Sequence, residues 1–291
     1  MPPEDPRKST MSPKPEGPQQ PPGLQAEMTV QPDYGEASYK GHGRLKDRAA
    51  LITGGDSGIG RAVALAFARE GADVAISYLP EEQTDADETA RVVRAAGRRC
   101  LTLPGDIREE AHCNHLVRRT HEEFGRLDIL VNNAAFQMTH ESMTEITAEE
   151  FDRVFRTNIY APFYLCKAAL PLMQPGASII NTASVEAYQP DYFLLHYAST
   201  KGALVAFTKA LAHEAIKKGV RVNAVAPGPI WTPLIPATMS LEKVQAFGQQ
   251  SPIGRAGQPA ELAPIYVLLA SDESSYVVGA VYAVTGGMIT A

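Results

Sequence analysis

From residue 48 onward, short runs of β-branched and apolar residues alternate with longer amphipathic segments. The short runs predict strands and the longer segments predict helices. We expect strands at residues 49–53, 73–77, 99–103, 129–131, 178–182, 221–225 and 280–284, and helices at residues 58–70, 85–96, 109–124, 148–172, 197–218 and 259–270. This alternation predicts a parallel sheet with helices on both faces. Residues 45–291 are therefore expected to form one doubly wound, Rossmann-type α/β domain with a seven-stranded parallel sheet.

Residues 1–44 differ in composition from the rest of the chain. They hold nine of the 22 prolines and show no apolar periodicity. Such a segment cannot bury enough apolar surface to offset the entropy that ordering costs. We expect a disordered tail. The alternative is an extended arm that lies on a neighbouring subunit, with Tyr34 and Tyr39 as anchors.

Charge and cysteine usage limit the class of protein. The net charge of −6 argues against nucleic acid and anionic membranes as partners. No stretch approaches the roughly 18 apolar residues of a membrane span, and no apolar segment of a secretory signal is visible. The three cysteines are far apart in sequence, which is typical of a reducing compartment. We therefore expect a soluble, cytoplasmic protein.

A glycine-rich turn follows the first predicted strand. Residues 53–60 read TGGDSGIG, and a helix pattern begins at once. Gly54 permits a tight turn, Gly58 removes a side chain from the path of a phosphate, and Gly60 allows close helix–strand packing. The free N–H groups of the following helix would face the pyrophosphate of a dinucleotide. The context between strand and helix predicts a dinucleotide site.

The second predicted strand bears on the choice between NAD and NADP. Residues 77–79 contain no Asp or Glu that would bind the adenosine ribose of NAD. Glu81 and Glu82 come slightly later and are expected to face solvent. We therefore favour NADP and keep NAD as the alternative, with donors for a 2′-phosphate among Arg61, Ser57, Ser77 and the Tyr78 backbone.

A candidate acid/base group lies at the start of the helix predicted at residues 197–218. Tyr197 and Lys201 are four residues apart and share one helical face. A nearby ammonium and a positively charged nicotinamide would lower the pKa of the Tyr197 phenol. Ser184 follows a predicted strand, at the edge where open α/β sheets bind ligands. Asn158 is a polar residue in a predicted helix, and an ordinary helix asparagine is the alternative.

These motifs together resemble the short-chain dehydrogenase/reductase family over residues 45–291. The turn at 53–60 is similar to the family's TGxxxGIG, residues 132–135 to its NNAG, and Pro227-Gly228 to its PG turn. The sequence as a whole also resembles a bacterial, stress-associated, aldehyde-reductase-like subgroup of this family, whose members carry a Pro-rich N-terminal extension. Two departures are Ala135 in place of glycine and Thr200 in place of serine.

The resemblance implies catalytic roles. Tyr197 would exchange a proton with the substrate oxygen, Ser184 would hold that oxygen, Lys201 would bind the nicotinamide ribose, and Asn158 would position a water. Asp106 would accept a hydrogen bond from the adenine amino group. The family also implies a homotetramer. The residues expected to contact the cofactor are Gly54, Ser57, Gly58, Ile59, Gly60, Tyr78, Leu79, Asp106, Ile107, Asn133, Ala134, Tyr197, Lys201, Pro227, Gly228, Ile230 and Thr232.

The predicted activity is hydride transfer between NAD(P)(H) and a small carbonyl or alcohol. The alternative is a dinucleotide-binding sensor or scaffold without turnover. Tyr188, Tyr192 and Phe193 predict an aromatic pocket wall, and residues 234–250 predict either a mobile lid or a fixed surface helix. The histidines and cysteine at 112, 113, 115 and 121 are interpreted as a solvated helix face, and no metal is expected.

Overall fold

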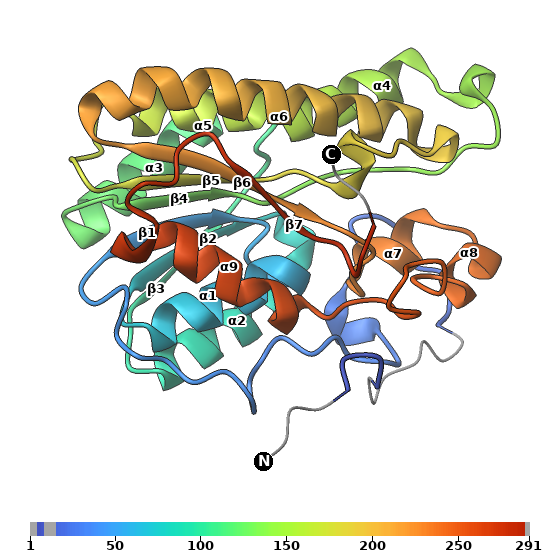
Figure 1. Cartoon of the computed structure of the whole chain (residues 1–291), viewed down its shortest axis with the longest axis horizontal. Helices are drawn as coiled ribbons and strands as arrows, with labels where there is room; N and C mark the ends of the chain where they lie inside the picture. The colour runs from blue at the N-terminus through green and yellow to red at the C-terminus, as the bar shows by residue number, and fades with distance from the viewer. Residues whose placement is uncertain (1–4, 9–15, 289–291) are drawn as a thin grey trace.

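The computed structural model of the chain describes residues 5–8 and 16–288. Within them a seven-stranded, all-parallel sheet runs in the order β3-β2-β1-β4-β5-β6-β7 (Figure 1). The strands are β1 (Ala49–Thr53), β2 (Asp73–Tyr78), β3 (Cys100–Pro104), β4 (Ile129–Asn132), β5 (Ser178–Thr182), β6 (Arg221–Pro227) and β7 (Val281–Val284). The predicted fold class is confirmed.

Helices cover both faces of the sheet (Figure 1). One layer holds α1 (Gly58–Arg69), α2 (Gln83–Ala95) and α9 (Pro259–Ala270), and the other holds α3 (Glu110–Phe124), α4 (Ala148–Phe155), α5 (Ala161–Ala169) and α6 (Leu195–Ala215). Side chains that alternate along a strand enter opposite cores. Ile52 therefore packs with Phe67 and Tyr266, whereas Leu51 packs with Leu165.

The order of the strands reverses between β1 and β4, which places a crevice at their carboxyl ends. β1 pairs with β2 on one side and with β4 on the other. The chain leaves these two strands toward opposite sides, so the loops after them diverge. Two short helices, α7 (Leu234–Thr238) and α8 (Leu241–Gln245), lie at this end of the sheet (Figure 1).

One predicted helix is interrupted in the structure. The segment predicted at 148–172 forms α4, a π-helical turn over Arg156–Tyr160, and α5. Pro162 has no N–H to donate to the carbonyl of Asn158, four residues earlier, so the regular helical ladder cannot continue there. The Ala161 N–H bonds instead to the carbonyl of Arg156, five residues back.

Residues 16–44 are packed against the domain, which differs from the disordered tail expected from composition. Gln25 and Met28 are buried, and Tyr39 donates a hydrogen bond to Glu70 at 2.7 Å. These contacts are made within the chain, and the alternative of an arm that lies on a neighbouring subunit stays a prediction. The parts of the expected tail at 1–4 and 9–15, and the domain end at 289–291, lie outside the described residues.

The structure also bears on membrane insertion. In the described part of the chain, no helix is both long enough and apolar enough to cross a bilayer.

Candidate active site

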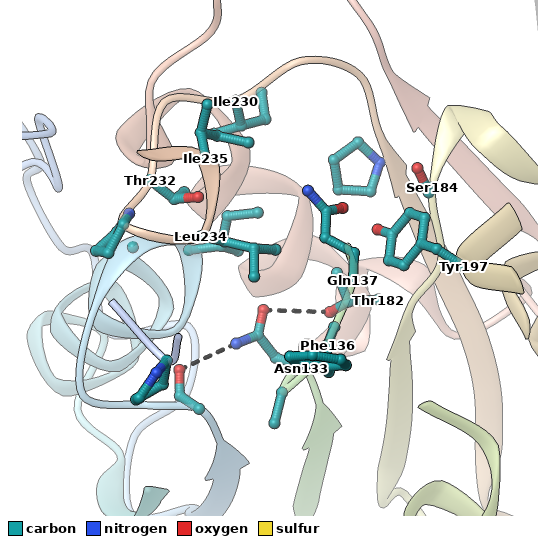
Figure 2. Close-up of a pocket in the computed structure, with 18 of the residues that line it drawn as sticks. Asn133, Phe136, Gln137, Thr182, Ser184, Tyr197, Ile230, Thr232, Leu234 and Ile235 are labelled. Atoms are coloured by element: carbon teal, nitrogen blue, oxygen red, sulfur yellow. Dashed lines mark hydrogen bonds between the residues drawn. The ribbon is translucent and has the colours of Figure 1, made fainter. Parts of the chain in front are cut away.

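A large cavity opens at the carboxyl ends of the strands. Its volume of about 500 Å³ lies in the range of sites for small molecules and cofactors. Segments far apart in sequence line it: the glycine-rich turn, the loops after β4 and β5, the start of α6, and the loop after β6. Figure 2 shows residues of four of these segments converging on the cavity.

The glycine-rich turn has the geometry of an anion cradle. Gly54 has a φ of 59°, and a Cβ at Gly60 would lie 1.8 Å from the Gly54 carbonyl oxygen. The helix therefore lies directly against the turn, which only glycine permits. Within the described residues, the N–H groups of Ile59 and Gly60 have no acceptor. They are the free donors that a pyrophosphate needs at a helix N-terminus.

Asn133 fastens the loop after β4 to this turn. Its Nδ2 donates to the carbonyls of Thr53 and Gly54 at 3.1 and 3.0 Å. The hydroxyl of Thr53 accepts from the N–H groups of Asn133 and Ala134, and Thr182 lies on the other side of the Asn133 amide (Figure 2). The structure thus gives Asn133 a bracing role between β1, β4 and β5.

Tyr197, Ser184 and Lys201 come together at the inner end of the cavity. The Tyr197 and Ser184 side chains lie side by side (Figure 2). Burial raises the pKa of Tyr197, and the hydrogen bond with Ser184 opposes that effect. Lys201 is buried, donates to the Thr182 carbonyl at 2.7 Å, and lies with Nζ 5.2 Å from the Tyr197 ring centre. Burial lowers the pKa of Lys201 to about 7.

Asn158 lies in the π-helical turn and bridges two other segments. Its Oδ1 accepts from the Phe136 N–H, and its Nδ2 donates to the Phe136 carbonyl and to the Thr200 hydroxyl, at 2.9 to 3.0 Å. Thr200 in turn donates to the Tyr197 carbonyl at 2.6 Å. Asn158 therefore joins the loop after β4 to the start of α6. π-turns are frequent at functional sites.

The end of the cavity near β2 carries two carboxyl groups. Asp56 and Glu82 both line it, so the expectation that Glu82 faces solvent is wrong. Burial raises the pKa of Asp56 to about 6, and burial together with the Asp56 charge raises the pKa of Glu82 to about 9. The Ser77 hydroxyl and Asp56 Oδ2 are buried and lack a hydrogen-bond partner among the described residues.

Arg61 is not available to a cofactor phosphate, contrary to the sequence interpretation. The guanidinium is buried and forms an ion pair with Asp85 at 3.2 Å. It also donates to the Asp56 carbonyl and to the Thr89 hydroxyl. Its role in the structure is to join α1 to α2 beneath the turn.

Asp106 and Ile107 line the cavity beside Tyr78 and Leu79. The Asp106 carboxylate accepts a bidentate ion pair from Arg108. Burial alone would raise the pKa of Asp106, but the hydrogen bonds from Arg108 hold it below its usual value. An ionised carboxylate of this kind can accept a hydrogen bond from an amino group.

Sequence reasoning missed a cluster of His140, Glu150 and His196 next to the cavity. Glu150 Oε1 lies 2.6 Å from His140 Nε2 and 2.8 Å from His196 Nε2. These are hydrogen-bond distances, and they tie the loop after β4 to α4 and to the start of α6. His196 directly precedes Tyr197, but its two partners lie 46 and 56 residues away in the sequence, which gives no local signal for the cluster.

The wall of the substrate end is apolar but differs from the expected one. Phe193 lines it, whereas Tyr192 is 65% exposed and Tyr188 packs in a separate cluster. The remaining apolar wall comes from Phe136, Leu234, Ile235, Met239 and Phe247. Residues 234–250 contain the two short helices α7 and α8 and pack on the domain, with Ile235 and Val244 buried. A lid motion of this segment stays a prediction.

The chain is similar in sequence to known proteins. The family model described as enoyl-(acyl carrier protein) reductase matches residues 54–289. The chain belongs to the short-chain dehydrogenase/reductase family. An uncharacterized oxidoreductase of Bacillus subtilis, YhdF, is 53% identical over 91% of this chain and 92% of its own length. The NADPH-dependent aldehyde reductase 1 of Arabidopsis thaliana is 46% identical over 92% and 95%.

A solved structure is similar as well. The short-chain dehydrogenase of Burkholderia cenocepacia in complex with NADP superimposes with a TM-score of 0.78 at 31% identity, covering 84% of this chain and 99% of its own. Family and structure together support an oxidoreductase that uses a nicotinamide dinucleotide. The residues present fit that group, because the glycine-rich turn offers free N–H donors and the buried Ser77 hydroxyl lacks a partner.

Proposed function

We propose that this protein transfers a hydride between a nicotinamide dinucleotide and a small carbonyl or alcohol. The observation that carries the proposal is the buried phenol of Tyr197, held beside Ser184 and Lys201 in the cavity that begins at the glycine-rich turn. We keep the contacts named from the sequence, from Gly54 to Thr232, as the proposed cofactor contacts. A homotetramer and a cytoplasmic location also remain proposals.

Tyr197 acts on the substrate oxygen in this scheme. In reduction the phenol donates its proton to the carbonyl oxygen, while the Ser184 hydroxyl donates a hydrogen bond that stabilises the developing negative charge. The Lys201 ammonium favours the resulting phenolate. The dinucleotide supplies the hydride in reduction and accepts it in oxidation.

The substrate class follows from the wall of the cavity. Phe136, Leu234, Ile235 and Phe247 offer apolar contact, so the group attached to the carbonyl is expected to be apolar. The name of the Arabidopsis relative supports an aldehyde as the carbonyl.

For the cofactor, we propose a preference for NAD(H). The sequence argument for NADP relied on the lack of a carboxylate at residues 77–79, whereas Asp56 and Glu82 also line this end of the cavity. Burial raises the pKa of both groups, and the Asp56 charge raises that of Glu82 further, so Asp56 is the carboxylate proposed to face the ribose. A carboxylate accepts from ribose hydroxyls and repels a 2′-phosphate. NADP(H) is the second candidate, favoured by the Arabidopsis relative and the NADP-bound structure.

The Asp56→Asn variant tests the cofactor proposal. It removes the charge, so the ratio of the Kd values for NADPH and NADH should fall roughly tenfold, since a charge pair a few Å apart is worth on the order of 1–4 kcal/mol. Asp87→Asn, an exposed carboxylate on α2, is the matched control and should leave the ratio unchanged. Tighter binding of NADPH than NADH by the wild type would contradict the proposal.

Turnover separates the enzyme from the sensor alternative. Purified protein is incubated with NADH or NADPH and a panel of small aldehydes and ketones, and loss of nicotinamide absorbance is followed. The enzyme proposal expects turnover with at least one apolar aldehyde. Tight dinucleotide binding with no turnover across the panel would favour the sensor.

A further inference from the structure

The N-terminal arm, residues 16–34, touches both sides of the cavity proposed to hold the dinucleotide. Pro21 and Pro22 line the cavity themselves. In Figure 1 the arm runs beside α7, at the end of the sheet where the cavity opens. A segment expected from composition to be a detached tail is thus part of the cavity wall.

Gln25 joins the arm to the glycine-rich turn. Its side-chain Oε1 accepts from the Gly58 N–H at 2.9 Å, and the residue is fully buried. Ser57, at the N-cap position of α1, makes no side-chain cap. Gln25 therefore supplies the cap that the helix lacks and leaves the N–H groups of Ile59 and Gly60 free for an anion.

The backbone of the arm at Gln25 is held by the side chain of Asp85 in α2. The Asp85 carboxylate accepts from the N–H groups of Gln25 and Ala26 at 2.6 and 2.9 Å, and it also pairs with the buried Arg61. Asp85 thus couples the arm to α1 and α2. Glu16 joins two parts of the arm, because its buried carboxylate accepts hydrogen bonds from the N–H groups of Thr29 and Val30.

The same arm fixes the segment after β6. The Gln19 N–H donates to the Pro236 carbonyl at 3.0 Å, and the Trp231 Nε1–H donates to the Val30 carbonyl at 2.9 Å. Met28 is buried with Trp231 in one apolar cluster. The arm therefore spans from the pyrophosphate turn to the loop proposed to cover the nicotinamide.

The NADP-bound Burkholderia structure matches over 99% of its own length but covers only 84% of this chain. About a sixth of this chain therefore has no counterpart in that structure. The Bacillus relative covers 91% of this chain. A protein of similar fold therefore binds NADP without a counterpart to that part of this chain.

We infer that the arm is a built-in component of the dinucleotide site, with Gln25 as a positioning residue that holds the Gly58 N–H and with Pro21 and Pro22 as a wall that retards release of the bound cofactor. The inference rests on the proposed function. It assigns Gln25 no contact with the substrate or the reacting atoms. Its effect is on the affinity and the release rate of the dinucleotide, and not on the chemical step.

The two test variants each replace one glutamine of the arm by methionine. Gln25→Met removes the acceptor for Gly58, while Gln31→Met removes only donations to the arm's own carbonyls at Gln25 and Met28. The Kd and release rate of NADH are measured by nicotinamide fluorescence, and kcat is measured at saturating NADH. Gln25→Met should raise both the Kd and the release rate about tenfold, because the turn loses the hydrogen bond that holds it in the binding geometry. Its kcat for the chemical step should stay within about twofold.

Gln31→Met should bind NADH as the wild type does. Equal Kd and release rate for Gln25→Met and the wild type would overturn the inference while leaving the proposed function intact. A wild type that binds neither NADH nor NADPH would overturn both.

Hydrogen–deuterium exchange of the wild-type chain covers the case in which Gln25→Met does not fold. Addition of NADH should slow exchange at residues 16–34 as well as in the glycine-rich turn. Slowing in the turn with no change in the arm would contradict the inference.

Discussion

Tyr197 shows at the scale of one residue how burial sets a chemical role. A phenol buried beside a serine stays protonated at neutral pH, since burial raises its pKa. It is then ready to donate a proton to a carbonyl. The reverse reaction needs the phenolate, which the Lys201 ammonium and a positively charged nicotinamide favour. The pairing of Tyr197 with Lys201 was predicted from spacing, because two residues at i and i+4 share a helical face whatever the tertiary context. Ser184 was predicted from its position after a strand.

The two directions of the reaction should therefore respond to pH in opposite ways. Reduction should be fastest below pH 7, since Tyr197 is protonated there and Lys201, with a pKa of about 7, is mostly charged. Alcohol oxidation should rise with pH by up to about tenfold per unit, because the phenol must lose its proton. The measurement is kcat in both directions from pH 6 to 9. A reduction rate that rises with pH would contradict this account.

At the scale of the element, the sequence signal for the glycine-rich turn differs from the signal for the π-helical turn between α4 and α5. The glycine-rich turn was predictable because each glycine answers a local steric need. The interruption between α4 and α5 had a signal in Pro162, but a proline does not say whether the helix bends, ends or forms a π-turn. The bridging of Asn158 to Phe136 and Thr200 depends on packing between segments 22 and 42 residues away, which spacing cannot give.

Two glycine-to-alanine variants test the turn. Gly60→Ala puts a Cβ 1.8 Å from the Gly54 carbonyl oxygen, so it should destabilise the fold by about 1–3 kcal/mol and weaken dinucleotide binding. Gly202→Ala, in the interior of α6 with no atom within 4 Å of the new Cβ, should stabilise it by roughly 0.5–1 kcal/mol. Thermal unfolding and NADH titration check both. A tolerated Gly60→Ala would show that the turn is not packed as described.

At the scale of the whole molecule, the arm was the largest departure from the sequence prediction. Its prolines and polar residues indicate little burial on their own. In the structure its few apolar side chains, such as Met28, share a cluster with Trp231, some 200 residues away. Likewise, Glu82 was expected to face solvent, because the sequence does not show how the start of α2 is oriented relative to the glycine-rich turn. Contacts between distant segments decided both cases, whereas the sheet itself followed from local alternation.

Two methionines test whether the arm is part of the stable fold. Met28→Ala removes a side chain that is 4% exposed and should cost ~2–5 kcal/mol in the free energy of unfolding. Met143→Ala, at 70% exposure, is the matched control and should cost under about 0.5 kcal/mol. Denaturant unfolding measures both. Equal stabilities would mean that the arm does not contribute to the fold.

The central claim is that Tyr197 is the acid/base of a dinucleotide-dependent oxidoreductase. The most direct test is turnover of Tyr197→Phe, measured beside NADH binding, with Tyr188→Phe as a control in a tyrosine that packs away from the cavity. We predict that Tyr197→Phe loses about 10²- to 10⁴-fold in kcat and binds NADH normally, while Tyr188→Phe retains activity. Retention of turnover by Tyr197→Phe, with any carbonyl substrate that the wild type reduces, would contradict the account.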